Sequence, residues 1–200
     1  MSKQKKLSVI EKAIKIFKNG GVVIFPTDTV WGIGCSINQP KAIKKLYQIK
    51  KREPAKPTAV LVGSVKQAEK LGVINKQAKK LIQKYWPGGL TIIVKAKSTV
   101  PQLIQGNQGT VGLRMPNHQQ LLTILCQLDN AVVASSANFS GQPVPNKKSA
   151  IDKKLVAQTD LIVDGQTGGN LASTVIAVNK KPFKLIRRGI IAPDKLPLDK

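Results

Sequence analysis

Apolar and polar residues alternate along the chain with two different periods, which predicts helices and strands that follow one another. Over residues 8–19 the apolar side chains recur every three or four positions, as on one face of a helix. Ser8 and Glu11 have the spacing of a capping box at the start of this helix, and Gly20 follows its end. Residues 22–25 are continuously apolar, which is typical of a short strand buried on both faces.

The same patterns predict more elements of both kinds. Helices are predicted at residues 40–51, 65–71, 76–86 and 118–127. Strands are predicted at residues 58–62, 91–95, 111–114, 131–134, 161–163, 174–178 and 183–187. Interleaved strands and helices predict an α/β fold, and the close spacing of the last strands indicates a mixed sheet flanked by helices. The length fits a single domain, predicted at residues 1–191, with residues 192–200 as a loose C-terminal tail.

Composition adds a strong positive charge to this picture. The formal net charge is +23, and no acidic residue occurs between Lys70 and Gln127. A field of this sign attracts polyanions, so RNA or DNA is the natural partner. The alternative is a lysine-rich surface that contacts only solvent, and lysines near the N-terminus such as Lys5 and Lys6 fit that interpretation.

Some classes of function are disfavoured by the residues present. Cys35 and Cys126 have neither the spacing of metal ligands nor that of a secreted disulfide framework, so no metal site is expected. The single histidine, His118, is predicted at a helix start and cannot complete a serine-type triad. Apolar runs of about five residues are far shorter than the roughly 20 of a membrane span, so no membrane association is expected. We therefore expect a cytoplasmic protein.

Arginine is rare here, and its positions are informative. Of the 33 basic residues only four are arginines, and Arg52, Arg114 and Arg187 fall in motif-like segments. A guanidinium group offers a planar fork of donors that binds a carboxylate or phosphate at two points. The three residues therefore predict a site for an anionic ligand, with pairing to structural carboxylates as the alternative. Lys50, Arg52 and Lys56 form a cluster suited to phosphates, although a helix dipole also favours cations at a helix C-terminus.

Polar loops follow two of the buried strands, and ligands of α/β sheets bind at such loops. Residues 26–34 contain two threonines, an aspartate, Trp31 and several small residues, and we predict a binding loop with Trp31 in its middle. Residues 135–141 carry small hydroxyls and an amide that could line a pocket. We do not expect a nucleophilic serine there, because no base is available to activate it. Neither a P-loop nor a Rossmann fingerprint is present.

Seven segments resemble, in order, the motifs of the YrdC-like family, the threonylcarbamoyl-AMP synthases. They are PTDTVWGIG at 26–34, KKR at 50–52, WPGGLT at 86–91, VGLRMP at 111–116, SANFSG at 136–141, STVI at 173–176 and LIRRG at 185–189. Each segment alone is a weak signal, but seven in this order at compatible spacing are a strong one, and the resemblance covers roughly residues 8–191. The resemblance implies an open, twisted α/β sheet with a basic concave face. The chain ends where longer relatives continue into another domain, so it resembles the short, bacterial kind.

The resemblance also implies a reaction. L-threonine, bicarbonate and ATP, usually accompanied by Mg²⁺, give L-threonylcarbamoyladenylate and pyrophosphate. Partner enzymes then place the threonylcarbamoyl group on the adenosine next to the anticodon of certain tRNAs. Such a reaction needs no covalent enzyme intermediate, because positioning and preorganised cations suffice.

Site residues follow from the resemblance position by position. The threonine-binding residues are expected to be Thr27, Arg114 and Ser173, with Arg114 on the carboxylate. The ATP-binding residues are expected to be Lys50, Arg52, Lys56, Thr110, Ser136, Asn138 and Arg187. Lys50 and Arg52 are the catalytic candidates among them.

The chain departs from the family pattern at a few positions. Trp31 stands where tyrosine is usual, and Leu61 where many longer members have histidine. Both lie at the amino-acid end, so a paralogue that uses another amino acid or carbamoyl donor stays an alternative. Lys56 and Gly89 replace an asparagine and a proline. A module that binds double-stranded RNA without catalysis is the second alternative, since the charge supports it.

Overall fold

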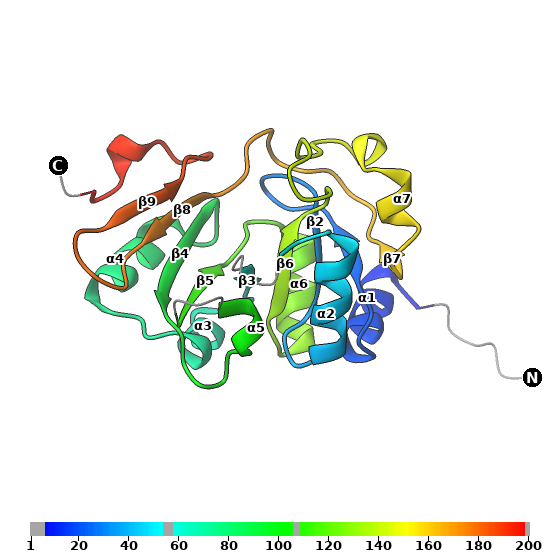
Figure 1. Ribbon diagram of the computed structural model, residues 1–200, viewed down its shortest axis with the longest axis horizontal. Coiled ribbons are helices and arrows are strands. Elements are labelled where there is room, and N and C mark those ends of the chain that lie inside the picture. The colour runs from blue at the N-terminus through cyan, green and yellow to red at the C-terminus, as the bar shows by residue number, and fades with distance from the viewer. Residues whose placement is uncertain (1–6, 54–57, 106–108, 199–200) are drawn as a thin grey trace, which may run out of the picture.

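A mixed β-sheet forms the centre of the molecule (Figure 1). It is seen in a computed structural model that describes residues 7–53, 58–105 and 109–198. The strands are β1 (Val23–Phe25), β2 (Gly32–Ser36), β3 (Ala59–Leu61), β4 (Leu90–Lys95), β5 (Thr110–Arg114), β6 (Val132–Ser136), β7 (Leu161–Ile162), β8 (Thr174–Ala177) and β9 (Lys184–Arg187). They lie in the order β7-β1-β2-β6-β3-β5-β4-β8-β9. The pairs β1–β7, β3–β5 and β4–β8 are parallel and the other pairs antiparallel, which confirms the predicted mixed α/β sheet.

Helices flank the sheet, and most begin where the sequence predicts. They are α1 (Val9–Lys18), α2 (Pro40–Ile49), α3 (Val65–Leu71), α4 (Lys76–Tyr85), α5 (Gln102–Gln105), α6 (Gln119–Leu128) and α7 (Lys153–Val156). Ser8 and Glu11 form both hydrogen bonds of the predicted capping box, and His118 caps α6. The short helices α5 and α7 were not predicted, because about one turn is too short to show a periodic pattern. Among the described residues, no helix is long and apolar enough to cross a membrane.

The structure corrects the prediction for residues 26–34. We expected a loop with Trp31 in its middle, but Gly32 begins β2, which pairs with both β1 and β6. Glycine is depleted in strands, so the two glycines concealed this strand in the sequence. A Cβ atom on Gly34 would lie only 2.5 Å from the backbone oxygen of Val133, so the close approach of β6 requires glycine here. Trp31 is therefore a buried residue at the entrance to a strand.

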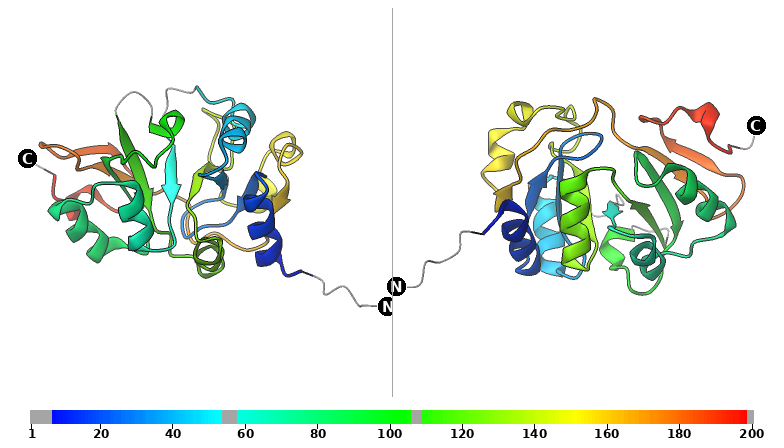
Figure 2. Two further views of the ribbon diagram at one scale, coloured as in Figure 1. Left: turned by 90° about the horizontal axis from the view of Figure 1, so that it is seen from below. Right: turned by 180° about the vertical axis from the view of Figure 1, so that it is seen from behind.

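The two faces of the sheet have different surroundings. On one face, Val23, Phe25 and Val132 pack against α1 and α6. Figure 2 (left) shows α1 and α6 on one side of the sheet and α2 on the other. Farther along, the face that carries Phe25 continues over β3, β5, β4 and β8 and becomes the floor of a cavity. The opposite face belongs to a larger apolar cluster with residues of α2, α3 and α4.

The expectation of a loose C-terminal tail is also corrected, for residues 192–198. Leu196 is only 7% exposed and belongs to the larger apolar cluster. The Tyr85 hydroxyl donates a hydrogen bond of 2.5 Å to the backbone oxygen of Lys195. These residues therefore pack on the domain, near β8 and β9 in Figure 1.

Candidate functional site

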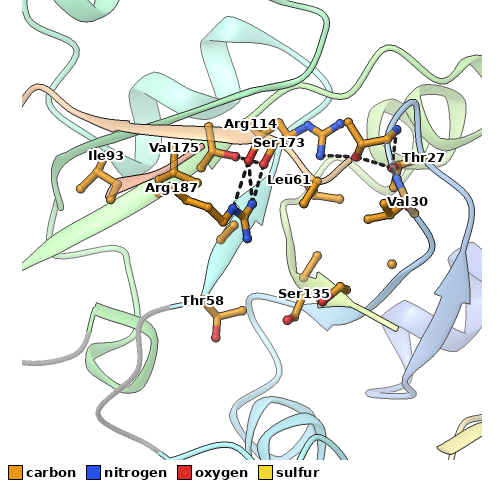
Figure 3. A pocket seen from close by; sticks show the side chains of 18 of the residues that line it. Thr27, Val30, Thr58, Leu61, Ile93, Arg114, Ser135, Ser173, Val175 and Arg187 are labelled. Carbon is orange, nitrogen blue, oxygen red and sulfur yellow. Dashed lines mark hydrogen bonds between the residues drawn. The ribbon is translucent and has the colours of Figure 1, made fainter. Parts of the chain in front are cut away.

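A cavity of about 600 Å³ lies over the open half of the sheet. Its floor carries small side chains such as Ala59, Gly112 and Ala177, which leave room for a ligand. Its walls include residues of the first predicted binding loop, such as Thr29, and two residues of the second, Ser135 and Ser136, which form the end of β6 rather than a loop. A volume of this size fits a small-molecule site. The cavity brings together Arg52, Arg114 and Arg187, the three arginines that the sequence singled out. Arg114 and Arg187 are labelled in Figure 3.

Arg114 is held in a fixed orientation at the end of β5. It is 6% exposed. Its Nη2 donates to Asp28 Oδ1 (2.6 Å), Nη1 to Thr29 Oγ1 (3.0 Å), and Nε to the backbone oxygen of Gly88 (3.1 Å). One N–H on each η nitrogen remains after these contacts, and such a pair can bind a carboxylate. The pairing of Arg114 with a structural carboxylate is therefore observed, and its remaining donors leave the binding of an anionic ligand as a prediction.

Opposing influences act on the charge of Arg114, and their net effect is a lowered pKa. Burial lowers the pKa of Arg114, the charge and hydrogen bond of Asp28 offset part of this shift, and the charge of Arg187 lowers the pKa further. Asp28 was noted in the sequence as part of a loop, but its pairing with a residue 86 positions away left no signal there. A guanidinium that is buried beside one carboxylate keeps its charge and can still attract an anion.

Thr27 folds the loop that carries Asp28 and Thr29. Its hydroxyl accepts hydrogen bonds from the backbone N–H groups of Thr29 (3.0 Å) and Val30 (3.2 Å) and donates to the backbone oxygen of Val30 (2.7 Å). This pattern makes a tight turn that presents both partners of Arg114. Thr27 also lines the cavity. Its contact with threonine stays a prediction.

Ser173 lines the same cavity as Arg114 and is buried (Figure 3). Its Oγ is 2.8 Å from Thr91 Oγ1. Arg187 donates from Nη2 to Ser173 Oγ (2.9 Å) and to the Ser173 backbone oxygen (2.9 Å), and from Nε to that same oxygen (3.1 Å). Thr91 belongs to the WPGGLT segment, and the sequence predicts no ligand contact for it. Side chains alternate between the two faces along β4, so Thr91 lies on the same face as Ile93. This alternation is the sequence signal that could have placed Thr91 at the site.

Lys50 has a position that the sequence did not suggest. It is 2% exposed, and it is absent from the residues that line the cavity. Its Nζ donates to the backbone oxygens of Ser136 (2.5 Å) and Asn138 and to Asn138 Oδ1 (3.1 Å). These acceptors match the three N–H groups of an ammonium. Lys50 thus supports the loop at the end of β6 from behind, and a direct contact with a triphosphate stays a prediction.

The pKa of Lys50 reflects this environment. Burial lowers its pKa from 10.5 to about 7, and the charge of Arg52 contributes as the second cause. The pKa of Arg187 is lowered by the same two causes, first burial and then the charge of Arg52. Arg52 therefore lies near both residues.

The other candidates divide into three groups. Arg52, Thr110 and Ser136 line the cavity, and their contact with ATP stays a prediction. Asn138 is bound to Lys50 and to Ser136, whose Oγ donates to Asn138 Oδ1 (2.6 Å). Lys56 lies outside the described residues.

Comparisons with known proteins agree with this geometry. The Sua5/YciO/YrdC family model, described as "Telomere recombination", matches residues 15–189. The chain is 34% identical over 191 residues to the threonylcarbamoyl-AMP synthase of Bacillus subtilis, with 94% of this chain and 55% of that protein covered. It is 30% identical over 171 residues to the threonylcarbamoyl-AMP synthase of Xylella fastidiosa, with 84% of this chain and 91% of that protein covered.

A solved structure of a member of this family has a similar fold. The crystal structure of P. abyssi Sua5 complexed with L-threonine matches with a TM-score of 0.87 and 31% identity, over 92% of this chain and 56% of that chain. The chain thus spans about half the length of the B. subtilis and P. abyssi proteins and most of the X. fastidiosa protein.

Proposed function

The chain belongs to the Sua5/YciO/YrdC family, and from this premise we propose that it is a threonylcarbamoyl-AMP synthase. It forms L-threonylcarbamoyladenylate from L-threonine, bicarbonate and ATP and releases pyrophosphate. The observation that carries the proposal is the oriented Arg114 at one end of a cavity that also holds Arg52 and Arg187. One fork suits an amino-acid carboxylate, and the other cations suit phosphates.

Threonine occupies the Arg114 end in this proposal. Its carboxylate accepts from the η nitrogens of Arg114, and Ser173 and the Thr27 turn lie within the same wall. The triphosphate and adenylate lie toward Arg52, Arg187, Thr110 and Ser136. Lys50 and Asn138 act on the nucleotide through the loop that they hold.

The chemistry needs positioning rather than a nucleophilic side chain. Bicarbonate releases hydroxide and supplies CO₂. The free amine of threonine adds to the carbon of CO₂ and gives one proton to this hydroxide, so a carbamate and water are formed. A carbamate oxygen then forms a bond to the α-phosphorus, and the bond from this phosphorus to the bridging oxygen breaks as pyrophosphate leaves. Arg52 and Arg187 stabilise the charge that builds up on the phosphate oxygens. Preorganised cations at a fixed distance from the amine are sufficient for this step.

Mg²⁺ is proposed only as a companion of ATP. Among residues 7–53, 58–105 and 109–198, no group of three or more His, Cys, Asp or Glu side chains could hold a metal ion. Asp28, the carboxylate bound to the cavity-lining residue Arg114, is already engaged in that ion pair. Mg²⁺ commonly binds to substrate phosphates with few protein ligands, so it would arrive as part of the substrate.

Pyrophosphate release tests the proposed function. ATP should yield pyrophosphate only when both threonine and bicarbonate are present, and mass spectrometry should detect the threonylcarbamoyladenylate. A panel of other amino acids tests the paralogue alternative, because Trp31 and Leu61 line this cavity. Equal pyrophosphate release without threonine contradicts the assignment.

We also propose that the product serves tRNA modification in the cytoplasm together with partner enzymes, and that this chain contacts tRNA directly. The net charge of +23 supports the contact. The logarithm of tRNA affinity should then fall linearly with the logarithm of salt concentration. Affinity that is independent of salt, or no binding at low salt, would mean that the lysines only contact solvent.

A further inference from the structure

Two motif segments that are separate in the sequence form one structural unit at the cavity. Residue 173 belongs to the first segment and residue 187 to the second. Arg187 donates two hydrogen bonds to the backbone oxygen of Ser173 and one to its hydroxyl (Figure 3). The residue proposed to bind ATP is therefore bonded directly to a residue proposed to bind threonine.

A β-bulge turns Arg187 toward the cavity. Val175 pairs with Arg187, but the next residue, Ile176, pairs with Leu185, so β9 contains one extra residue. If the Ile176–Leu185 register continued without a bulge, Arg187 would lie opposite Thr174, on the other face of the sheet. A one-residue shift exchanges the faces of a strand, and bulges re-aim side chains in this way.

Gly189 fixes the distance between the two segments. A Cβ atom on Gly189 would lie 2.3 Å from the backbone oxygen of Ala172 and 2.5 Å from the backbone nitrogen of Thr174. The next residue, Ile190, donates from its backbone N–H to the Ala172 oxygen (3.0 Å). This close contact explains why a glycine follows the two arginines, and it holds Arg187 against Ser173.

The side chains of Arg187 and Ser173 each use part of their hydrogen-bonding capacity on protein partners and keep the rest for a ligand. Arg187 uses Nε and Nη2 on Ser173, which leaves Nη1 for a phosphate. Ser173 Oγ accepts from Arg187 and shares a hydrogen bond with Thr91. These two partners fix the direction of the remaining hydrogen-bonding capacity of the Ser173 hydroxyl. Without Arg187 the hydroxyl could rotate away.

We infer that Arg187 is a positioning residue for the amino-acid end of the cavity, in addition to its proposed contact with ATP. It fixes the Ser173 hydroxyl in the direction that threonine needs. The inference rests on the proposed function, because it assumes that threonine binds beside Arg114 and Ser173. It predicts that threonine binding depends on Arg187 even when no nucleotide is present.

Calorimetry of threonine binding without ATP tests this dependence. Arg187→Lys keeps the positive charge but cannot donate to two acceptors through a planar fork. Its threonine affinity should fall by about tenfold, the scale of one lost charge-assisted hydrogen bond. The matched control is Arg188→Lys, a change of the same type at the exposed neighbouring residue, which should bind threonine like the unmodified protein. Equal melting temperatures establish that all variants are folded.

A double-mutant cycle shows whether the effect passes through Ser173. In a Ser173→Ala background there is no hydroxyl to position, so Arg187→Lys should change threonine affinity by less than about twofold. A tenfold loss in both backgrounds, or no loss in the Arg187→Lys single variant, overturns the inference and leaves the proposed function intact. Failure of the unmodified protein to bind threonine at all overturns both.

Discussion

Arg114 and Lys50 are both buried cations near the cavity, yet the protein balances their charges in different ways. Arg114 is 6% exposed and Lys50 is 2% exposed. Arg114 has a carboxylate partner, Asp28, at 2.6 Å. The oxygens that accept from Lys50 Nζ are uncharged, and the nearby charge of Arg52 is positive.

The difference teaches what each cation can do. A guanidinium holds its proton under ordinary conditions, so Arg114 with its remaining N–H groups suits the binding of an anion at any working pH. A buried ammonium without a counter-ion loses its proton more readily, and the pKa of Lys50 is about 7. Lys50 therefore suits the support of a loop, which needs hydrogen bonds more than it needs charge.

Removing the carboxylate that pairs with Arg114 should have the largest effect on the stability of the fold. Asp28→Ala leaves a buried guanidinium without its counter-ion and should destabilise the fold by roughly 3–5 kcal/mol. Urea unfolding measures the loss. The control is Asp164→Ala, because Asp164 pairs with Lys148 at the surface and its side chain is 79% exposed. That variant should change stability by less than about 1 kcal/mol. Similar losses in both variants contradict our description of the Arg114 end.

The second prediction concerns how turnover depends on Arg52 and Lys50. Arg52→Ala removes a cation from the cavity wall, and turnover should fall by about 100-fold or more, the scale of one lost transition-state donor. Lys50→Ala should show a comparable loss, because Ser136 and Asn138 lose the ammonium that holds their loop. If these residues only oppose a helix dipole, each change costs roughly 0.3–1 kcal/mol of stability and leaves turnover nearly intact. Pyrophosphate release and thermal melts on the same variants decide between these outcomes.

A smaller effect should appear in the pH dependence of stability. The pKa of Lys50 is about 7 in the folded protein against an ordinary value of 10.5, so the unfolded chain binds the extra proton between these values. Lys50 therefore opposes folding fully below pH 7, and this opposition fades as the pH rises toward 10.5. Lys50→Met removes the effect.

Unfolding at several pH values measures this contribution. Between about pH 7 and 9, the unmodified protein should gain roughly 2 kcal/mol of stability relative to Lys50→Met. Lys51→Met, at the exposed neighbouring residue, controls for the loss of one positive charge. A difference between the unmodified protein and Lys50→Met that stays constant with pH would show that Lys50 keeps its proton when buried.

The comparison also shows which features a sequence can reveal. The capping box at Ser8, the helix start at His118 and the apolar stripes depend on residues close in the chain, and the structure confirms them. The three arginines were identified by their rarity and by their motifs, and they do line one cavity. These signals are local or compositional, so the sequence contains them.

Partners that are distant in the sequence were not predictable. The acceptors of Lys50 include two backbone oxygens, and a backbone oxygen leaves no trace in residue identity. The strand β2 was missed because its glycines are required by the close approach of β6, which only the folded sheet reveals. The orientation of Arg187 depends on a bulge in β9. Each of these features depends on contacts between segments that are distant in the chain rather than on local pattern.

The most direct test of the account is whether Arg114 binds the threonine carboxylate. Arg114→Lys keeps the charge beside Asp28 but loses the fork. Calorimetry should show threonine affinity weakened by about 1–3 kcal/mol, the scale of a charge-assisted hydrogen bond in this setting. ATP affinity should hardly change, because in our proposal the phosphates bind toward Arg52 and Arg187. Unchanged threonine binding together with weakened ATP binding would contradict the central claim that the two ends of the cavity bind these two substrates.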